Sequence, residues 1–391
     1  MIEIKAKENC CGCYACYNIC PKQCITMKTD NEGFCYPNIN KDKCINCNLC
    51  EKVCPIINPI KRADSKKIAY AGMNKDEQVR IKSSSGGIFS ILAEYVIKNN
   101  GIVYGASFDE EFDIKHKRIL YSKDLGLLRG SKYVQSSIGD VYQQVKNDLK
   151  NNKQVLFTGT PCQIEGLRSY LRKEYVNLIT MDFICHGVPS PLVWKKYLEE
   201  MKKSKQENIK NIYFRNKDIG WKVFSLKIIF DEKIYINDLN NDLFMKGFLQ
   251  DVYLRPSCYS CKFKKINRVS DITVADFWGI ENILPKMYDN KGTSLIVIHS
   301  EKGKQLFDEL SKKMILNEVN LNEAIRYNLS MISSVKYNKK RNNFFVELNS
   351  GKGIVYLLSK YTRISFIIKL KNKIKRGIKK LIKYDSGRKI I

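Results

Sequence analysis

Apolar and polar positions follow two patterns from residue 68 onward, and together they predict an α/β domain. Residues 86–101, "GGIFSILAEYVIKNNG", predict a helix that stops at a glycine. Residues 154–173 predict a strand, a tight turn and a helix. Segments that predict further strands are 67–73, 102–108, 176–187, 271–280 and 293–300. Strands that alternate with helices are typical of a parallel or mixed sheet.

Two stretches depart from this alternation. Three short apolar runs between Asn211 and Ile236 predict an antiparallel insertion. Residues 58–67, "NPIKRADSKK", are polar and predict a linker. We therefore expect a small domain at 1–60, a larger α/β domain at 68–330 and a helical tail at 331–391.

Cysteine spacing organises the first 60 residues. A C-x2-C-x2-C-x3-C string followed by proline occurs twice, at Cys10, Cys13, Cys16 and Cys20 and again at Cys44, Cys47, Cys50 and Cys54. This spacing is typical of bacterial two-cluster ferredoxins, in which the fourth cysteine of each string binds the other cluster. The predicted ligand sets for two [4Fe–4S] clusters are Cys10, Cys13, Cys16 and Cys54, and Cys44, Cys47, Cys50 and Cys20.

Structural zinc is the alternative at these cysteines. Zinc sites use four ligands in pairs, and neither the third C-x2-C step nor the Cys-Pro ending is typical of them, so the spacing favours clusters. Cys11, Cys24 and Cys35 fall outside the strings. We interpret these three as packing residues, with further ligands as the alternative, because free cysteine behaves as a small apolar side chain.

The chain shows no sign of a secreted or membrane-spanning protein. Met1 to Lys7 lack the apolar segment of a leader, and no apolar run approaches the ~18 residues of a spanning helix. We therefore expect a cytoplasmic protein, in which clustered cysteines bind metal rather than form disulfides.

Four further cysteines predict a third site. Cys162 and Cys185 follow two predicted strands, where ligands gather in open α/β sheets, and "CYSC" adds Cys258 and Cys261. A third cluster is favoured, and zinc or unliganded thiols are the alternatives. His186, beside Cys185, is a candidate ligand or proton donor, or simply a hydrogen-bonded structural residue.

Residues 83–87, "SSSGG", precede the predicted helix at 86–101. Free backbone N–H groups at a helix start suit a phosphate, and an ordinary N-cap explains the same residues. The chain has no G-x-G-x-x-G or Walker A string, so neither an ordinary dinucleotide fold nor a P-loop is supported.

The ordered motifs resemble a known family. A two-cluster ferredoxin module followed by "SSSGGIFS", "GSKYVQSS", "FTGTPCQIEGLR", "DFICHGVPSP", "CYSC" and "DITVADFWG" is similar to the coenzyme F-420 hydrogenase/dehydrogenase beta-subunit family over about residues 5 to 330. Members of that family bind FAD and iron–sulfur clusters. They exchange hydride with a deazaflavin or another organic substrate.

This resemblance implies roles for particular residues. Ser84, Ser85, Gly86 and Gly87 would hold FAD phosphates, with Lys132 and Tyr133 in the same pocket. Thr158, Gly159 and Thr160 would lie near the flavin, and Asp276 is a weaker candidate. The implied ligands of a cluster beside FAD are Cys162, Cys185, Cys258 and Cys261.

The expected function is electron transfer by an iron–sulfur flavoprotein oxidoreductase. A flavin can convert between hydride transfer and the one-electron steps of clusters, which would pass electrons to a redox partner protein or carrier. The alternative is a non-catalytic electron-relay subunit, one that would serve surface-polysaccharide synthesis. Relatives differ in substrate, so the resemblance implies the cofactors more firmly than the deazaflavin.

Positive charge gathers at the C-terminus. The chain carries a net charge of +28, and its last 41 residues contain many lysines and a single acidic residue. Five apolar residues recur there at helical spacing: Ile367, Leu370, Ile374, Ile378 and Leu381. A basic amphipathic helix at 360–384 suits an anionic membrane surface, and a helix docked on the protein is the alternative. Nucleic-acid binding is disfavoured because no nucleic-acid module is recognisable.

Overall fold

The computed structural model describes residues 1–62 and 67–363. The N-terminal region contains α1 (Ala15–Ile19), β1 (Ile25–Thr29), β2 (Cys35–Ile39) and α2 (Leu49–Lys52), and β1 pairs antiparallel with β2. The two cysteine strings share a backbone conformation. Gly12 and Asn46 occupy equivalent positions with φ of 68° and 52°, and Tyr14 and Asn48 do so with φ of 66° and 56°. A repeated sequence therefore builds a repeated loop and short helix.

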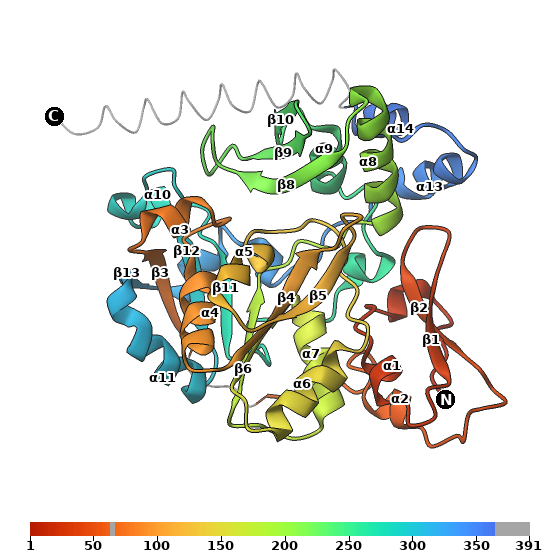
Figure 1. Ribbon diagram of the computed structural model, residues 1–391, viewed down its shortest axis with the longest axis horizontal. Coiled ribbons are helices and arrows are strands. Elements are labelled where there is room, and N and C mark those ends of the chain that lie inside the picture. Colours follow the sequence, from red (N-terminus) through yellow and green to blue (C-terminus); the bar gives the residue numbers. More distant parts are fainter. Residues whose placement is uncertain (63–66, 364–391) are drawn as a thin grey trace.

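An eight-stranded sheet forms the centre of the larger domain (Figure 1). Its strands, in spatial order, are β13 (Met314–Val319), β3 (Ile68–Asn74), β12 (Ser294–Ile298), β11 (Ile272–Asp276), β7 (Leu178–Phe183), β6 (Val155–Gly159), β4 (Ile102–Phe108) and β5 (Ile114–Ile119). The pairs β11–β7, β7–β6 and β6–β4 are parallel, and the remaining pairs are antiparallel. The predicted α/β domain with a mixed sheet is confirmed.

Both faces of this sheet are buried. Val103, Leu156 and Ile179 lie in an apolar cluster with α4 (Ile88–Lys98) and α11 (Glu301–Leu310). The alternate residues Tyr104, Phe157 and Leu178 lie in a second cluster with α6 (Val141–Lys150) and α7 (Pro161–Leu171). Burial on both faces is what continuous apolar runs in parallel strands predict. Shorter helices are α3 (Glu77–Ile81), α5 (Leu125–Leu128), α10 (Ile280–Ile283) and α12 (Leu321–Ile325).

A separate antiparallel sheet lies above the main sheet in Figure 1. It has the order β10 (Ile234–Asp238), β9 (Ser225–Phe230) and β8 (Ile209–Asn216), so the predicted insertion is present. Helices that share its core are α8 (Pro191–Lys205), α9 (Leu243–Leu249), α13 (Arg341–Asn349) and α14 (Ile354–Thr362). The described part of the predicted tail thus packs in this core. Its apolar stripe from Ile367 to Leu381 lies outside the described residues.

The N-terminal region packs directly on the larger domain. α1 contacts α7, and a Cβ atom built on Gly166 of α7 would lie 2.8 Å from Cys13 Cβ. Arg341 and Glu32 form an ion pair of 2.5 Å across the boundary, and Asn18 Nδ2 donates to the Gly139 carbonyl over 2.8 Å. The cysteine strings therefore lie against the α/β domain.

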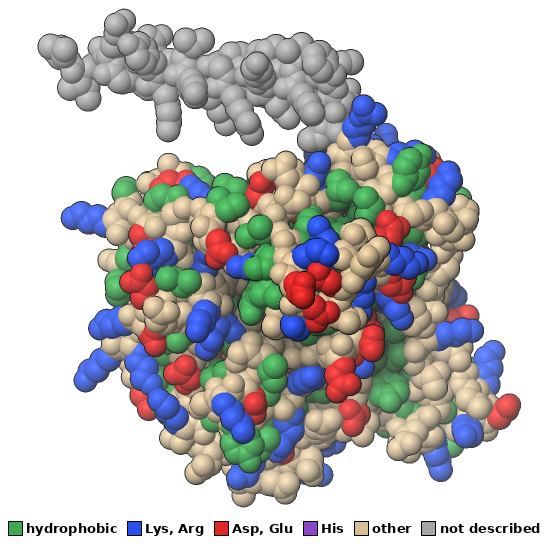
Figure 2. All heavy atoms as spheres, turned by 45° about the horizontal axis from the view of Figure 1, so that its top comes forward, with side chains coloured by type: hydrophobic (Ala, Val, Ile, Leu, Met, Phe, Trp, Pro, Cys, Tyr) green, Lys and Arg blue, Asp and Glu red, His purple; other side chains and the backbone are tan. Residues whose placement is uncertain are grey.

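The surface mixes charges of both signs. On the face shown in Figure 2, Lys and Arg side chains lie among Asp and Glu side chains rather than in one continuous basic patch. Within residues 1–62 and 67–363, no helix combines the length and the apolar character that crossing a membrane would require.

Candidate metal and cofactor sites

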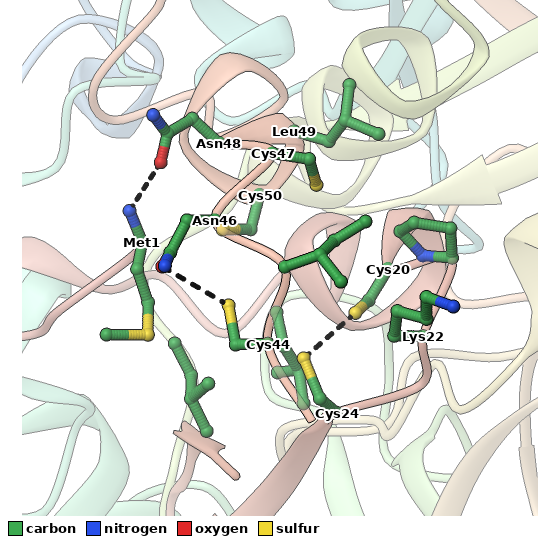
Figure 3. Close-up of a pocket in the computed structure, with 14 residues that line it drawn as sticks. Met1, Cys20, Lys22, Cys24, Cys44, Asn46, Cys47, Asn48, Leu49 and Cys50 are labelled. Carbon is green, nitrogen blue, oxygen red and sulfur yellow. Dashed lines mark hydrogen bonds between the residues drawn. The ribbon is translucent and has the colours of Figure 1, made fainter. Parts of the chain in front are cut away.

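Three cavities contain all twelve cysteines predicted as ligands. We call them the distal, proximal and third cavities. The distal cavity is lined by Cys20, Cys24, Cys44, Cys47 and Cys50 (Figure 3). Cys20, the last cysteine of the first string, thus lies with the first three of the second string. Cys47 is exposed, so this cavity opens to solvent.

Cys24 makes a fifth thiol in the distal cavity. Its Sγ lies 3.3 Å from Cys20 Sγ. Burial and the neighbouring Cys20 raise the pKa of the Cys24 thiol to about 11. Hydrogen bonds from the backbone and from Cys24 lower the pKa of Cys20 despite its burial. Cys24 is therefore a thiol in hydrogen-bond contact with the predicted ligand Cys20, and either sulfur can be the donor.

The proximal cavity is lined by Cys10, Cys11, Cys13, Cys16 and Cys54, together with apolar side chains such as Ile2 and Ile4. The last cysteine of the second string thus joins the first string. Burial, and then the neighbouring thiols, raise the pKa of Cys16 well above its usual range. Burial also raises the pKa of Cys54 to about 11. Thiolates in this apolar surrounding need a compensating positive charge, which iron would supply if bound there.

The third cavity lies at the end of the parallel strands. It is lined by Cys162, Cys185, Cys258 and Cys261. Cys162 lies in the first turn of α7 and Cys185 follows β7. Cys258 lies within the 3-10 helix Pro256–Ser260, and Cys261 directly follows it. Burial raises the pKa of the Cys258 thiol to about 12.

The start of α7 explains the position of Cys162. Thr160 and Gln163 form a capping box, and Pro161 occupies the first helical position. Thr160 Oγ1 lies 3.0 Å from Cys162 Sγ. The pKa of the buried Cys162 thiol is lowered. The neighbouring Cys11 has the largest effect, followed by Thr160 and Arg255. A helix N-terminus also favours a thiolate. Cys162 is therefore prepared to bind a metal as the thiolate.

Cys11 lies between two cavities. It lines both the proximal and the third cavity. The neighbouring thiols of Cys13 and Cys162, together with burial, raise the pKa of Cys11 well above its usual range. The sequence alone predicts only a packing role for Cys11. Nothing in its spacing marks the position, because it depends on how the N-terminal region docks on α7. Cys35 lines none of the three cavities, and its thiol lies 3.4 Å from Thr29 Oγ1.

His186 also lines the third cavity. Its Nε2 lies 2.7 Å from Asp251 Oδ1, and its ring packs edge-on against Phe248. One ring nitrogen is therefore engaged by a carboxylate.

The residues implied as a flavin site surround the start of α4. Gly87 caps this helix with φ of 82°, and no side chain bonds to its free N–H groups. Ser84 Oγ accepts from Ser131 N over 2.7 Å, and Ser85 Oγ donates to the Thr293 carbonyl over 2.9 Å. A Cβ on Gly86 would lie 2.3 Å from the Gly72 carbonyl oxygen, so only glycine fits there.

Lys132 and Tyr133 approach the same loop. Lys132 Nζ donates to the carbonyls of residues 128, 129 and 130 at 3.2 to 3.4 Å. Burial lowers the pKa of Lys132 to about 7. The Tyr133 ring stacks on Phe248 with centroids 4.8 Å apart, and its hydroxyl accepts from Arg215 over 3.2 Å.

Arg215 links this region to Asp276. Its guanidinium forms two hydrogen bonds to the Asp276 carboxylate, of 2.8 and 2.9 Å, and donates to the Ser84 carbonyl over 3.2 Å. Lys217 donates to the Ser85 carbonyl over 3.1 Å, and burial lowers its pKa to about 7. Arg215 and Lys217 come from β8 and the residues after it, so sequence reasoning gave no signal for them.

Thr158, Gly159 and Thr160 lie at the end of β6. Thr158 Oγ1 donates to the Tyr104 carbonyl over 3.0 Å, and the Thr158 carbonyl lies 3.0 Å from His116 Nε2. Burial, and then the charge of Lys132, lower the pKa of His116 to about 4. Of the nine implied flavin residues, only Thr160 lines one of the three cavities.

Comparison with known proteins gives two sequence matches and similarity to solved structures. Residues 152–324 match the family described as the C-terminal part of the beta subunit of coenzyme F420 hydrogenase/dehydrogenase, and residues 37–56 match "4Fe-4S binding domain". A chain of the F420-reducing [NiFe] hydrogenase complex from Methanosarcina barkeri is similar with a TM-score of 0.45 and 15% identity, over 73% of this chain and 91% of that chain. No curated protein matches the chain.

The sequence matches fall on two of the cysteine regions. The span 152–324 contains the four predicted ligands of the third cavity, whereas residues 84–87 and 132–133 precede it. The span 37–56 contains the second cysteine string. The resemblance found in the sequence is confirmed: residues 152–324 match the coenzyme F420 hydrogenase/dehydrogenase beta-subunit family, and a match to a 4Fe–4S binding domain precedes them.

Proposed function

We propose that the protein is an iron–sulfur flavoprotein oxidoreductase in which three [4Fe–4S] clusters form a path between an organic substrate and a redox partner. The observation that carries this proposal is the position of Cys11. It lines both the proximal and the third cavity, so the ferredoxin-like sites adjoin the family site. The distal cavity is the solvent-facing end, where a partner protein or carrier would exchange electrons.

The arrangement of the thiols supports clusters rather than zinc. Zinc requires its ligands within about 2.3 Å of one point. In the part of the chain that the structure describes, no group of three or more Cys, His, Asp or Glu residues is arranged to hold a single metal ion. The thiolates of a cubane each bind a different iron, so they surround a volume instead. The three cavities, each lined by at least four cysteines, suit that arrangement.

The fit to FAD rests on buried positive charge near free N–H groups. Neither Lys132 nor Lys217 forms an ion pair with a carboxylate in the described residues, and both pKa values fall to about 7 through burial. The start of α4 adds backbone donors that no side chain caps. A diphosphate would supply the missing negative charge. When bound, FAD would convert between hydride transfer and one-electron transfer.

The protein's own residues would position such a cofactor. Ser84 to Gly87, Lys132 and Tyr133 would hold it. Thr160 lines the third cavity and contacts Cys162, so it would place this predicted cluster ligand beside the cofactor. A deazaflavin such as coenzyme F-420 is the proposed hydride substrate. Contact of residues 360–384 with an anionic membrane remains a prediction on residues that lie mostly outside the described ranges.

An electron-relay subunit without flavin is the second candidate. The observation that favours it is that Ser84, Ser85 and Lys132 already bond to protein groups. The two candidates differ in flavin content and in direct reduction by a hydride donor.

The test is a spectrum of the full-length protein purified anaerobically, followed by addition of reduced deazaflavin. The oxidoreductase should contain about one FAD per chain, and its clusters should bleach with the donor alone. Protein with its clusters but without flavin, and unreactive toward the donor, would support the relay and overturn the flavoprotein proposal.

A further inference from the structure

Arg255 is a fully buried cation between the N-terminal region and the larger domain. It is 0% exposed and immediately precedes the 3-10 helix Pro256–Ser260, which carries Cys258. Its Nε donates to the Cys10 carbonyl over 2.8 Å, and one terminal nitrogen lies 3.5 Å from Cys10 Sγ. The guanidinium therefore touches a predicted ligand of the proximal cavity.

Its other contacts are neutral. The terminal nitrogens donate to Gln135 Oε1 over 2.9 Å and to the Cys35 carbonyl over 3.0 Å. The guanidinium also lies over the Tyr36 ring, 4.4 Å from its centroid. None of these groups carries a formal negative charge.

The other buried arginines differ in this respect. Each of the four others in the described residues forms an ion pair with a carboxylate, and the pairs are Arg80–Asp289, Arg215–Asp276, Arg268–Asp182 and Arg341–Glu32. Arg255 has no carboxylate partner in the same part of the chain. Arginine stays protonated in proteins, and an uncompensated buried charge is strongly destabilising. Arg255 therefore needs an anion, and the thiolates of the proximal cavity are the anionic groups beside it.

The backbone around Arg255 is shaped for this contact. Gly12 has φ of +68°, and a Cβ there would lie 2.6 Å from Gln135 Nε2 and 2.9 Å from Arg255 Cζ. Only glycine lets the first cysteine loop approach the guanidinium so closely. Sequence and fold thus place a fixed positive charge against the proximal site.

We propose that Arg255 is the counter-ion of the cluster in the proximal cavity and raises the reduction potential of that cluster. This inference rests on the proposed function. A cubane with four thiolates is an anion, and reduction by one electron adds a further negative charge. A buried cation stabilises the reduced form more than the oxidised form, because the attraction grows with the charge of the cluster. Arg255 is therefore a positioning and tuning residue, and it neither binds iron nor touches substrate.

The test is a redox titration, followed by EPR, of the full-length protein, three variants around the guanidinium and one variant of the distal cavity. Arg255→Met removes the charge, Arg255→Lys keeps it, and Gln135→Glu partly neutralises it with an almost isosteric change. Cys47→Ser removes a ligand of the distal cavity and so identifies the distal signal.

At a fixed ambient potential, R255M should lower the ratio of reduced to oxidised proximal cluster by about tenfold, which corresponds to ~59 mV for a one-electron couple. Q135E should shift it in the same direction, and R255K should stay near the wild type. The distal signal should not move in any of the three.

An unchanged proximal potential in R255M with full iron content would overturn the inference. If R255M loses its cluster, Q135E decides: a fall in potential supports the inference and no shift overturns it. Wild-type protein without iron would instead overturn the proposed function.

Discussion

The protein gathers cysteines in two regions, and the two regions hold them differently. In the N-terminal region each cavity takes three of its predicted ligands from a stretch of seven residues, shaped by left-handed backbone at Gly12, Tyr14, Asn46 and Asn48. In the larger domain the third cavity takes one predicted ligand from α7, one from the residues after β7, one from within a 3-10 helix and one from directly after it. Local sequence builds the first kind of site, whereas the sheet builds the second. Damage to the sheet should therefore affect the third cavity first.

The largest expected effect comes from breaking one kind of site at a time. Cys162→Ser should remove about four of about twelve iron atoms and leave the ferredoxin-like signals unchanged, because each cubane holds four irons. Cys47→Ser should remove a different set of about four. Iron analysis and EPR measure both. Cys35→Ser is the matched control, since Cys35 lines none of the three cavities, and it should keep all its iron. Unchanged iron in C162S would refute the third site.

The contact between the two regions can be tested at Gly166. Gly166→Ala would place a Cβ 2.8 Å from Cys13 Cβ and 3.0 Å from Cys13 Sγ. Such overpacking should lower the free energy of unfolding by about 1–3 kcal/mol and release iron from the proximal cavity first. Gly126→Ala, also in a helix, meets no atom within 4 Å, so it should be neutral or slightly stabilising. Equal thermal stability and iron content in the two variants would contradict this docking.

A smaller effect is expected when pH changes the affinity of the larger domain for FAD. Burial lowers the pKa of Lys132 to about 7. A bound phosphate favours the protonated lysine, so its pKa should be higher in the complex. FAD affinity should then fall as pH rises above about 7, by up to about tenfold per pH unit.

Titration of flavin-free protein with FAD from pH 6 to 9 measures this dependence. Lys132→Met should bind FAD weakly and lose most of the dependence, because the titrating amine is gone. A wild-type affinity independent of pH would exclude Lys132 as a phosphate ligand. Iron content should not change over this range in either protein.

The smallest expected effect concerns the fifth thiol of the distal cavity. Cys24 shares a hydrogen bond with Cys20 and lies outside the predicted ligand set. Cys24→Ala should keep the distal cluster and lower its potential slightly, because a hydrogen bond to a ligand sulfur is lost. Cys20→Ser should lose the cluster. If C24A loses iron and C20S keeps it, the ligand of the distal cluster is Cys24. The prediction that Cys20 of the first string binds this cluster would then be wrong.

The two regions also differ in how much the sequence predicts. The repeated spacing places eight cysteines in two cavities, because neighbouring residues determine the geometry. Segment 154–173 likewise predicts β6, the turn and α7. By contrast, β5 and β13 were not predicted, since both are edge strands with mixed burial. The sequence did not predict the positions of four residues near the sites, because these positions depend on docking between distant segments. The four are Cys11, Arg255, Arg215 and Lys217. Only the folded chain brings Cys11 against Cys162 or Arg255 against Cys10.

The central claim is that three cysteine-lined cavities hold three [4Fe–4S] clusters. Iron and acid-labile sulfide, measured per chain on full-length protein purified anaerobically, test it most directly. The account predicts about twelve of each, falling to about eight in C162S and again to about eight in C47S. Stoichiometric zinc with little iron, or about eight irons that C162S leaves unchanged, would contradict it.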